Sequence, residues 1–388
     1  MAKRNIKETL LSTLVHGEEV LNNIETMRKV NKDSLKEESV FSAAKRIHPC
    51  KLSLTVNEII DTNKDAKIFR FVSLDNVLPP FQAGQYINLW VEIDGCLTSR
   101  PYSISSSPKQ RGYYEITVAK TKNGFVSEYL LNRVKIGDNF VANGPSGNFV
   151  YNPVFHKTKS LFLAGGSSIT PFMSMIREIL LSGDERDIVL LYGSRILSTA
   201  IYHEELEDFS KKFKDFKYKL VLSEHDEKRN GDFGFLDEKI ITKYVPDVLE
   251  RTAYVCGPNV MHIFCKDVLL KIGLKQKDIR EEVFNSSQNI SQEKDYPLDF
   301  NVDQVFKIRI GDKVIDAKAS EPVLVALEKS NIRVNVCCRS GECSLCKVKL
   351  LNGKVYLAKG MLLRQADEKY GYIHSCKAYP LSDLEIEI

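Results

Sequence analysis

Apolar and polar residues follow a strand-like pattern between residues 50 and 156 of this 388-residue chain. The segments KLSLTVNEII, QYINLWVEI and YYEITVAK alternate or are rich in β-branched and aromatic residues, and one helical stretch, FVSEYLLNRV, interrupts them. Several short strands with turns between them predict a small antiparallel β-barrel over residues 50–156.

The pattern changes over residues 157–285. Apolar strands KSLFLAGG, DIVLLYGS and TAYVCG alternate there with helical segments such as PFMSMIREILL and NVMHIFCKDVLL. This alternation predicts an α/β domain with a parallel sheet. The polar stretch SSQNISQEKDYPLD predicts a linker over residues 286–300, and a further domain of about 90 residues follows it over 301–388. The chain is therefore expected to be multidomain.

Residues 1–48 are polar, with apolar residues at roughly helical spacing that is interrupted at Gly17. They predict a helical extension, either a partner-docking helix pair or a solvated extension. No stretch of about 20 apolar residues occurs, and the sequence MAKRNIKETL has no apolar signal core. We expect a cytoplasmic protein without a membrane span. The net charge of +4 is small and spread along the chain, so it gives no support to nucleic-acid binding.

The cysteines concentrate near the C-terminus, where five of nine fall in the last 52 residues. Cys338, Cys343 and Cys346 have the spacing C-x4-C-x2-C, and Cys376 follows 30 positions later. This spacing is typical of plant-type [2Fe–2S] ligands, which are soft thiolates delivered by a compact loop. A structural zinc site is the alternative, although such sites usually use paired C-x2-C knuckles. Cys337 is the odd residue, because only Cys338 gives the x4 spacing.

The C-terminal region resembles the plant-type ferredoxin family over roughly residues 303–388, including the closing segment GYIHSCKAYPLSDLEIEI. The resemblance implies an α+β, β-grasp-like domain that holds a [2Fe–2S] cluster through Cys338, Cys343, Cys346 and Cys376. The net charge of this region departs from the pattern of that family. Residues 301–388 contain 14 basic and 11 acidic residues, a net charge of +3, whereas free ferredoxins of this type are typically strongly acidic.

A candidate flavin motif lies in the predicted barrel. The segment Arg100–Ser103, RPYS, follows an apolar strand and a turn. Its arginine can pair with a phosphate, its tyrosine can lie along an isoalloxazine ring, and its serine can bond a ring edge. A turn that ends a strand is the alternative. The segment GFVS at 124–127 opens a helix whose amides suit a phosphate, and GPSGNF occupies 144–149.

A glycine-rich segment, AGGSSITP at 164–171, joins a strand to a helix in the α/β region. Its glycines permit close approach to a pyrophosphate, and we expect Thr170 to cap the helix with Pro171 in the first turn. A second segment, Cys256-Gly257-Pro258 with Met261 beyond it, ends the strand TAYVC. Alone, a cysteine such as Cys256 is more often a buried core residue.

Together these segments resemble the ferredoxin–NADP reductase superfamily over roughly residues 50–285, with its AGGxGITP and CGPxxM motifs. Ser168 replaces the last glycine of the first motif. The GPSGNF segment favours FAD over FMN. The resemblance implies flavin binding by Arg100, Pro101, Tyr102, Ser103, Val118, Lys120, Gly124, Val126, Ser127 and Phe284. It implies nucleotide binding by Gly165, Gly166, Thr170, Ser194, Arg195, Cys256, Gly257, Pro258 and Met261.

The choice between NADH and NADPH depends on a few charged residues. Arg195 is able to reach a ribose or a phosphate, whereas Glu224 stands where NADPH-using relatives often have a basic residue. A carboxylate accepts from a 2′-hydroxyl and repels a 2′-phosphate. We therefore favour NADH, while the nearby Lys228 and Arg229 leave NADPH open.

The sequence thus predicts an NAD(P)H-dependent oxidoreductase. Hydride would pass from the nicotinamide to the flavin, and electrons would pass singly to the cluster and then to a partner protein such as an oxygenase or hydroxylase component. Ser103, Thr170, Cys256 and Glu282 are the candidate transfer-site residues, and a solvated helix end is the alternative for the segment around Glu282. The competing function is a self-contained flavin reductase of a small molecule, or a cluster-based redox sensor.

Overall fold

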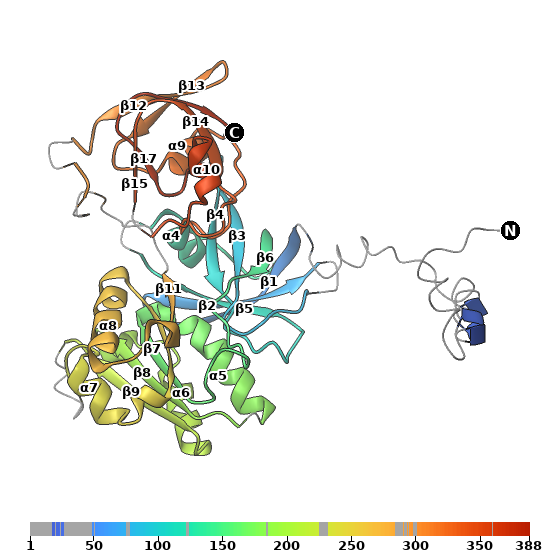
Figure 1. Cartoon of the computed structure of the whole chain (residues 1–388), viewed down its shortest axis with the longest axis vertical. Coiled ribbons are helices and arrows are strands. Elements are labelled where there is room, and N and C mark those ends of the chain that lie inside the picture. Colours follow the sequence, from blue (N-terminus) through green and yellow to red (C-terminus); the bar gives the residue numbers. More distant parts are fainter. Residues whose placement is uncertain are drawn as a thin grey trace. The chain divides into compact units, whose positions relative to one another are not determined.

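We describe the chain from a computed structural model (Figure 1). It divides into two compact units, Met1–Pro49 and Cys50–Ile388. The structure describes residues 18–19, 21–23, 25–26, 49, 51–74, 78–121, 124–183, 185–224, 232–283, 290, 293, 295–297, 301–358 and 360–388. In the first unit the described residues between 18 and 26 are helical, and the rest of the predicted extension at 1–48 lies outside the described residues.

The second unit begins with a six-stranded antiparallel sheet. Its strands are β1 (Leu52–Asn63), β2 (Ala66–Ser73), β3 (Tyr86–Ile93), β4 (Cys96–Ser103), β5 (Tyr114–Ala119) and β6 (Asn139–Ser146), in the order β4-β3-β6-β1-β2-β5. A bridge between Ile104 and Ile116 joins the two edges and closes the sheet. Alternate side chains, such as Leu52, Leu54 and Val56, are buried inside, and α4 (Phe125–Asn132) adds its apolar face to this core. The predicted antiparallel barrel is confirmed.

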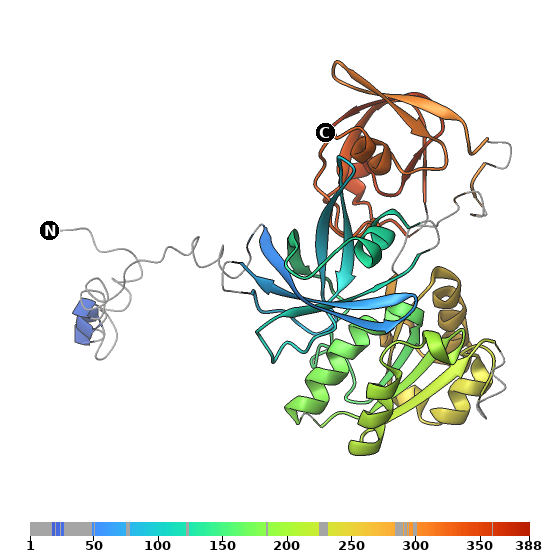
Figure 2. The same cartoon turned by 180° about the vertical axis from the view of Figure 1, so that it is seen from behind.

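A five-stranded parallel sheet follows, with the order β11-β10-β7-β8-β9. Its strands are β7 (Ser160–Gly165), β8 (Ile188–Ser194), β9 (Phe216–Leu222), β10 (Thr252–Gly257) and β11 (Ile279–Val283). Helices α5 (Thr170–Ser182) and α6 (His203–Lys212) pack against one face, and α7 (Glu238–Tyr244) and α8 (Asn259–Ile272) pack against the other (Figures 1 and 2). Strand order reverses between β7 and β10, so the carboxyl ends of these strands mark the expected ligand-binding crevice of such a sheet.

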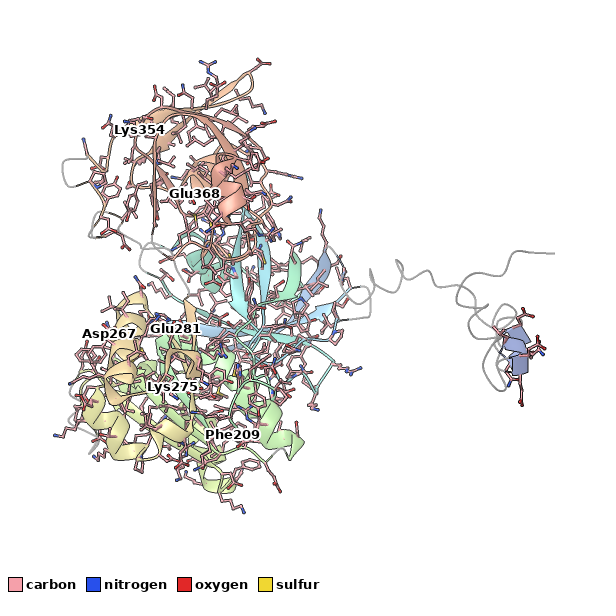
Figure 3. The ribbon with its side chains drawn as sticks, viewed as in Figure 1. Phe209, Asp267, Lys275, Glu281, Lys354 and Glu368 are labelled. Atoms are coloured by element: carbon pink, nitrogen blue, oxygen red, sulfur yellow. The ribbon has the colours of Figure 1, made fainter. Side chains whose placement is uncertain are left out.

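A salt bridge joins the edge strand of this parallel sheet to a covering helix. Glu281 on β11 (Figure 3) accepts from Lys266 Nζ of α8 at 2.9 Å.

The predicted α/β domain is confirmed, since all its strand pairs are parallel and helices cover both faces. No helix in the described part of the chain is both long and apolar enough to cross a membrane.

The remaining strands form a mixed sheet with the order β13-β12-β18-β14-β16, and a two-stranded ribbon of β15 and β17. The elements are β12 (Val305–Ile310), β13 (Lys313–Lys318), α9 (Val323–Lys329), β14 (Lys347–Asn352), β15 (Val355–Leu357), α10 (Gln365–Lys369), β16 (Tyr372–His374), β17 (Ala378–Pro380) and β18 (Leu384–Glu387). Helix α9 buries Leu324 and Leu327 in the core of the sheet. We call these elements the C-terminal domain, and they confirm the predicted α+β class.

The segment predicted as a polar linker is anchored to the C-terminal domain. Ile290 and Tyr296 are 1% and 3% exposed and pack with Ala358 and Tyr379. The polar composition of the segment hid these two large apolar side chains, whose burial is worth about 1.5–3 kcal/mol each. Ile290 and Tyr296 therefore anchor the segment, while Asp295 and Pro297 are exposed.

The barrel and the α/β domain meet around a buried carboxylate. Glu115 of β5 accepts from Arg177 Nη1 of α5 at 2.5 Å, from Arg70 Nε of β2 at 2.9 Å and from the Ser105 hydroxyl at 2.9 Å. Burial opposes ionisation of Glu115, but the charge and hydrogen bonds of Arg177, followed by those of Arg70, outweigh it and lower the pKa of the carboxyl. This network holds β5 against α5, close to the crevice of the parallel sheet.

Candidate functional site

The four predicted cysteine ligands are brought together by the loop between α9 and β14 and by the turn after β16. They form two pairs, Cys338 with Cys343 and Cys346 with Cys376. Cys343 lowers the pKa of the Cys338 thiol to about 4 through a hydrogen bond between the two side chains. Cys376 likewise lowers the pKa of the Cys346 thiol. In each pair the partner thiol thus favours the thiolate, the form that binds iron.

Backbone geometry directs N–H groups at these sulfurs. The Cys343 amide donates to Cys338 Sγ at 3.4 Å, and the Gly341 amide donates to the Cys376 sulfur. Gly341 has φ +83°, and a Cβ there would meet Lys377 Cγ at 3.0 Å and Met361 Cα at 3.3 Å. Glycine is therefore required at this position on two grounds, conformation and space.

This donor set fits a two-iron cluster. Among the described residues, no group of three or more His, Cys, Asp or Glu side chains is placed to hold a single metal ion. Two thiol pairs with N–H···S bonds would provide two ligands for each of two irons. The side chain of Cys337 contacts the barrel instead. Its thiol is buried and donates to the Tyr86 hydroxyl of the barrel at 3.7 Å.

The predicted flavin motif lies on β4 and ends in a buried serine. The Ser103 hydroxyl has no hydrogen-bond partner within the described part of the chain. The edge of a flavin ring would satisfy this buried hydroxyl, so the residue fits its predicted role. Arg100 donates to Thr98 Oγ1 at 2.9 Å and to the Ser99 carbonyl at 2.7 Å. Burial, followed by the nearby Arg339 charge, lowers the pKa of Arg100 to about 10. These partners are neutral, so the guanidinium charge is available to a phosphate.

The side chains of three other predicted flavin residues make contacts within the protein itself. Val118 and Val126 are 0% and 2% exposed in the barrel core, so only their backbone is able to contact a ligand. Ser127 Oγ donates to the Gly124 carbonyl at 3.3 Å and closes the turn before α4. Lys120 is exposed at the end of β5. Phe284 lies outside the described residues. Sequence reasoning did not separate backbone from side-chain contacts here.

The glycine-rich loop lies at the carboxyl end of β7, in the crevice of the sheet. Gly165 has no space for a Cβ, which would meet Met261 Sδ at 2.3 Å, whereas Gly166, with φ +56°, faces open space. Gly165 thus packs against the CGPxxM segment, and Gly166 is the position that a pyrophosphate is able to approach. Pro171 lies in the first turn of α5 as predicted. The predicted Thr170 cap is wrong. Ile169 is the N-cap, and the Thr170 hydroxyl donates to the Ser167 carbonyl at 2.7 Å.

Cys256 and Glu282 lie side by side at the carboxyl ends of β10 and β11, where they are register partners. Cys256 is fully buried. Burial and the Glu282 charge raise the pKa of its thiol, although a hydrogen bond with Ser168 opposes the shift. Burial raises the pKa of Glu282 well above its usual range, and the Glu342 charge adds to this effect. Glu282 Oε2 is buried without a partner in the described part of the chain.

Glu342 is a residue that sequence reasoning missed. It lies directly before Cys343 in the cysteine loop, yet its charge acts on Glu282 of the nucleotide crevice. The position of Glu342 between two predicted ligands marked it as a neighbour of the cluster, but nothing in the sequence connected it to Glu282.

The candidate ribose residues lie at the ends of β8 and β9. Arg195 Nε lies 3.5 Å from Glu224 Oε1, and both side chains are more than half exposed. The Ser194 hydroxyl donates to the Ile196 carbonyl at 3.1 Å and orders the turn after β8. The predicted competitors Lys228 and Arg229 lie outside the described residues.

Comparison with known proteins agrees with this architecture. Family models match in order along the chain: an oxidoreductase FAD-binding domain at residues 53–151, an oxidoreductase NAD-binding domain at 162–267 and a 2Fe-2S iron-sulfur cluster binding domain at 308–381. The fold resembles that of phthalate dioxygenase reductase, described as a modular structure for electron transfer from pyridine nucleotides to [2Fe-2S], with a TM-score of 0.66 and 24% identity over 87% of this chain and 98% of that chain.

Curated relatives extend over most of both chains. The glycine betaine monooxygenase reductase subunit of Chromohalobacter salexigens is 31% identical over 85% of this chain and 93% of its own length. The NADH oxidoreductase HCR of Escherichia coli is 27% identical over 86% of this chain and 97% of its own length.

The fold and the matched domains define an oxidoreductase of the iron–sulfur flavoprotein class. The chain belongs to the family of FAD- and NAD-binding reductases with a C-terminal 2Fe-2S domain, within the ferredoxin–NADP reductase superfamily.

Proposed function

We propose that this protein is the NADH-dependent reductase component of a multicomponent enzyme, and that it delivers single electrons to a separate oxygenase or hydroxylase protein. One observation carries the proposal. The Cys337 thiol of the cysteine loop donates at 3.7 Å to the hydroxyl of Tyr86, the β3 residue that pairs with Ser103 of the flavin motif. The cysteine loop and the flavin motif therefore lie close together in one chain, which supports a continuous electron path.

We assign the barrel motif to the flavin. Arg100 would hold a flavin phosphate, Tyr102 would lie along the ring, and the buried Ser103 hydroxyl would bond its edge. We assign Gly166 to the pyrophosphate and Cys256 to the nicotinamide face. Burial raises the pKa values of both the Cys256 thiol and the Glu282 carboxyl. Their burial would keep water away from the site of hydride transfer.

When bound, FAD accepts two electrons as a hydride and releases them singly, and the cluster accepts one at a time. We assign Cys338 and Cys343 to one iron and Cys346 and Cys376 to the other, following the two thiol pairs. We also propose the domain boundaries 50–156, 157–285 and 301–388 predicted above.

NADH is the proposed donor because Glu224 neutralises Arg195. The 3.5 Å approach of the two side chains removes the free cation that a 2′-phosphate would need, and leaves a carboxylate that accepts from a 2′-hydroxyl. The Escherichia coli relative is an NADH oxidoreductase, which supports the same choice of donor.

The partner is proposed from the relatives, among them a monooxygenase reductase subunit and a ketosteroid monooxygenase reductase component. The experiment combines purified protein with NADH and, in separate reactions, ferricyanide, cytochrome c and a purified oxygenase component. We expect turnover with the artificial acceptors, and substrate oxidation only when the oxygenase is added. Rapid reduction of O₂ or a small molecule without any acceptor protein would instead establish the self-contained reductase.

A further inference from the structure

Strands β3 and β4 of the barrel contact the C-terminal domain through buried polar side chains. Asn88, which is 0% exposed, donates from Nδ2 to the Val336 carbonyl at 2.9 Å and to Ser99 Oγ at 3.1 Å. The Thr98 hydroxyl donates to Glu328 Oε2 of α9 at 3.1 Å. Arg339 Nη2 donates to Thr98 Oγ1 at 3.1 Å and also bonds Glu328 Oε1. Burial makes these hydrogen bonds specific, because an unpaired member would be costly.

These contacts concentrate on the chain around one cysteine ligand. The Val336 carbonyl, the Cys337 thiol and the Arg339 guanidinium each contact the barrel, and Cys338 lies within this stretch. The hydrogen bonds described for the Cys376 sulfur instead come from inside the C-terminal domain. The barrel thus holds the loop at the Cys338 end.

On the barrel side, the same contacts lie opposite the flavin motif. In the antiparallel register of β3 and β4, Tyr86 pairs with Ser103 and Asn88 pairs with Pro101. Asn88 and Tyr86, which contact Val336 and Cys337, are thus β3 residues that pair with the flavin motif. Thr98, which contacts Arg339, lies just before the motif on β4. The strand pair therefore joins the Cys338 segment to the candidate flavin motif.

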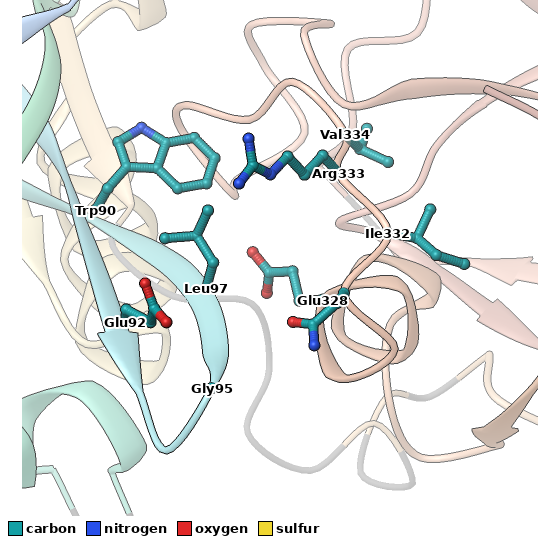
Figure 4. A pocket seen from close by; sticks show the side chains of 9 residues that line it. Trp90, Glu92, Gly95, Leu97, Glu328, Ile332, Arg333 and Val334 are labelled. Carbon is teal, nitrogen blue, oxygen red and sulfur yellow. The ribbon is translucent and has the colours of Figure 1, made fainter.

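Apolar packing alone does not hold this junction. Beside the polar contacts lies a hollow of about 230 Å³ between the β3–β4 hairpin and the C-terminal domain, lined by Trp90, Leu97, Glu328 and Arg333 among others (Figure 4). Trp90 packs partly against the core of the C-terminal domain. Contacts between domains of one chain are mobile by default, so the buried hydrogen bonds are what fix the geometry beside this hollow.

We propose that Asn88 and Glu328 are positioning residues, which dock the C-terminal domain on β3 and β4 and hold the cysteine loop at the distance from the flavin motif that electron transfer requires. The inference rests on the proposed function. Electron transfer falls steeply with distance, so a loosened dock slows the transfer from flavin to cluster and leaves the preceding hydride step unchanged.

The test compares Asn88→Ala and Glu328→Gln with Thr55→Val in the holoprotein. Thr55 is the control because its hydroxyl bonds Asn139 Oδ1 at 2.7 Å on an exposed part of the barrel. Anaerobic stopped-flow with NADH separates flavin reduction from cluster reduction, and rapid-freeze EPR measures the reduced cluster. We expect unchanged flavin reduction and cluster reduction slowed about tenfold or more, since misplaced redox groups react far more slowly.

Three further measurements exclude a merely structural effect. Iron and sulfide content and the cluster midpoint potential should equal those of the wild type. Trp90, the single tryptophan, should emit at longer wavelength and be quenched more readily by acrylamide in both variants, because the junction opens. The control should match the wild type throughout.

Wild-type cluster reduction rates in both variants would overturn the proposal. A slowed rate explained by an altered potential, or iron loss in both variants, would also overturn it, because the contacts would then tune or assemble the cluster. Failure of the wild type itself to reduce its cluster with NADH would instead refute the proposed function.

Discussion

Glu115 offers a quantitative test of how the barrel and the α/β domain are joined. Its carboxylate is 1% exposed and accepts from Arg177, Arg70 and Ser105 at 2.5–2.9 Å. Removing one partner of a buried ion pair costs about 3–5 kcal/mol, because a buried charge is left uncompensated. The Glu115→Ala variant should lose about 3 kcal/mol of unfolding free energy, near the lower end of this range, because Arg177 keeps its ion pair with Glu205 at 2.7 Å.

A matched control exists on the same network. Glu58 pairs with Arg70 at 2.7 Å but has a side chain that is 44% exposed, so Glu58→Ala should cost less than about 1 kcal/mol. Urea unfolding followed by Trp90 fluorescence, which reports on the barrel, measures both variants. Equal losses of stability in Glu115→Ala and Glu58→Ala would refute the reasoning, because burial would then make no difference.

The pH dependence follows from the sign of the shift. The folded-state pKa of Glu115 is lowered from an ordinary value of 4.5, so its stabilisation is fully present above that value and is lost as pH falls through the folded pKa. The difference in urea midpoint between wild type and Glu115→Ala should be constant at neutral pH and shrink under acid. A difference that grows on acidification would contradict the ion-pair assignment.

Four other variants test the site assignments. Cys338→Ser should lose the cluster and Cys337→Ser should keep it, as judged by iron and acid-labile sulfide; the reverse result would show that the ligand is misassigned. Arg100→Ala should lower FAD occupancy on dilution, through loss of a charge-assisted contact of about 1.5–3 kcal/mol, and full occupancy would exclude the phosphate role. Glu224→Lys should raise kcat/KM for NADPH relative to NADH by removing the carboxylate beside Arg195, and an unchanged ratio would place the ribose elsewhere.

The alternation of apolar residues was sufficient to predict the sheets. Leu52, Leu54 and Val56 alternate on one strand and face one core, so their spacing encodes the barrel directly. Spacing likewise grouped the four cysteines, because three of them belong to one short loop. Local patterns of this kind involve only residues that are close in sequence, so they can be recognised before the fold is known.

Long-range contacts were not predictable from such patterns. The approach of Glu342 to Glu282 and the hydrogen bond from Asn88 to Val336 join residues far apart in sequence, and each partner alone is an ordinary polar residue. The predicted helix cap at Thr170 was wrong for a related reason. The chain enters α5 through a 3₁₀ turn at Gly166–Ile169, which gives its hydroxyl a different acceptor.

The central claim is that electrons pass from the nicotinamide to the flavin and leave through the cluster. The most direct measurement is steady-state and stopped-flow turnover of Cys346→Ser, which removes a ligand of the second thiol pair. Reduction of the flavin by NADH and turnover with ferricyanide should remain largely intact, because a hydride is accepted before the cluster is reached, while reduction of cytochrome c should collapse. Cytochrome c reduction at the full wild-type rate by the cluster-free variant would contradict the account.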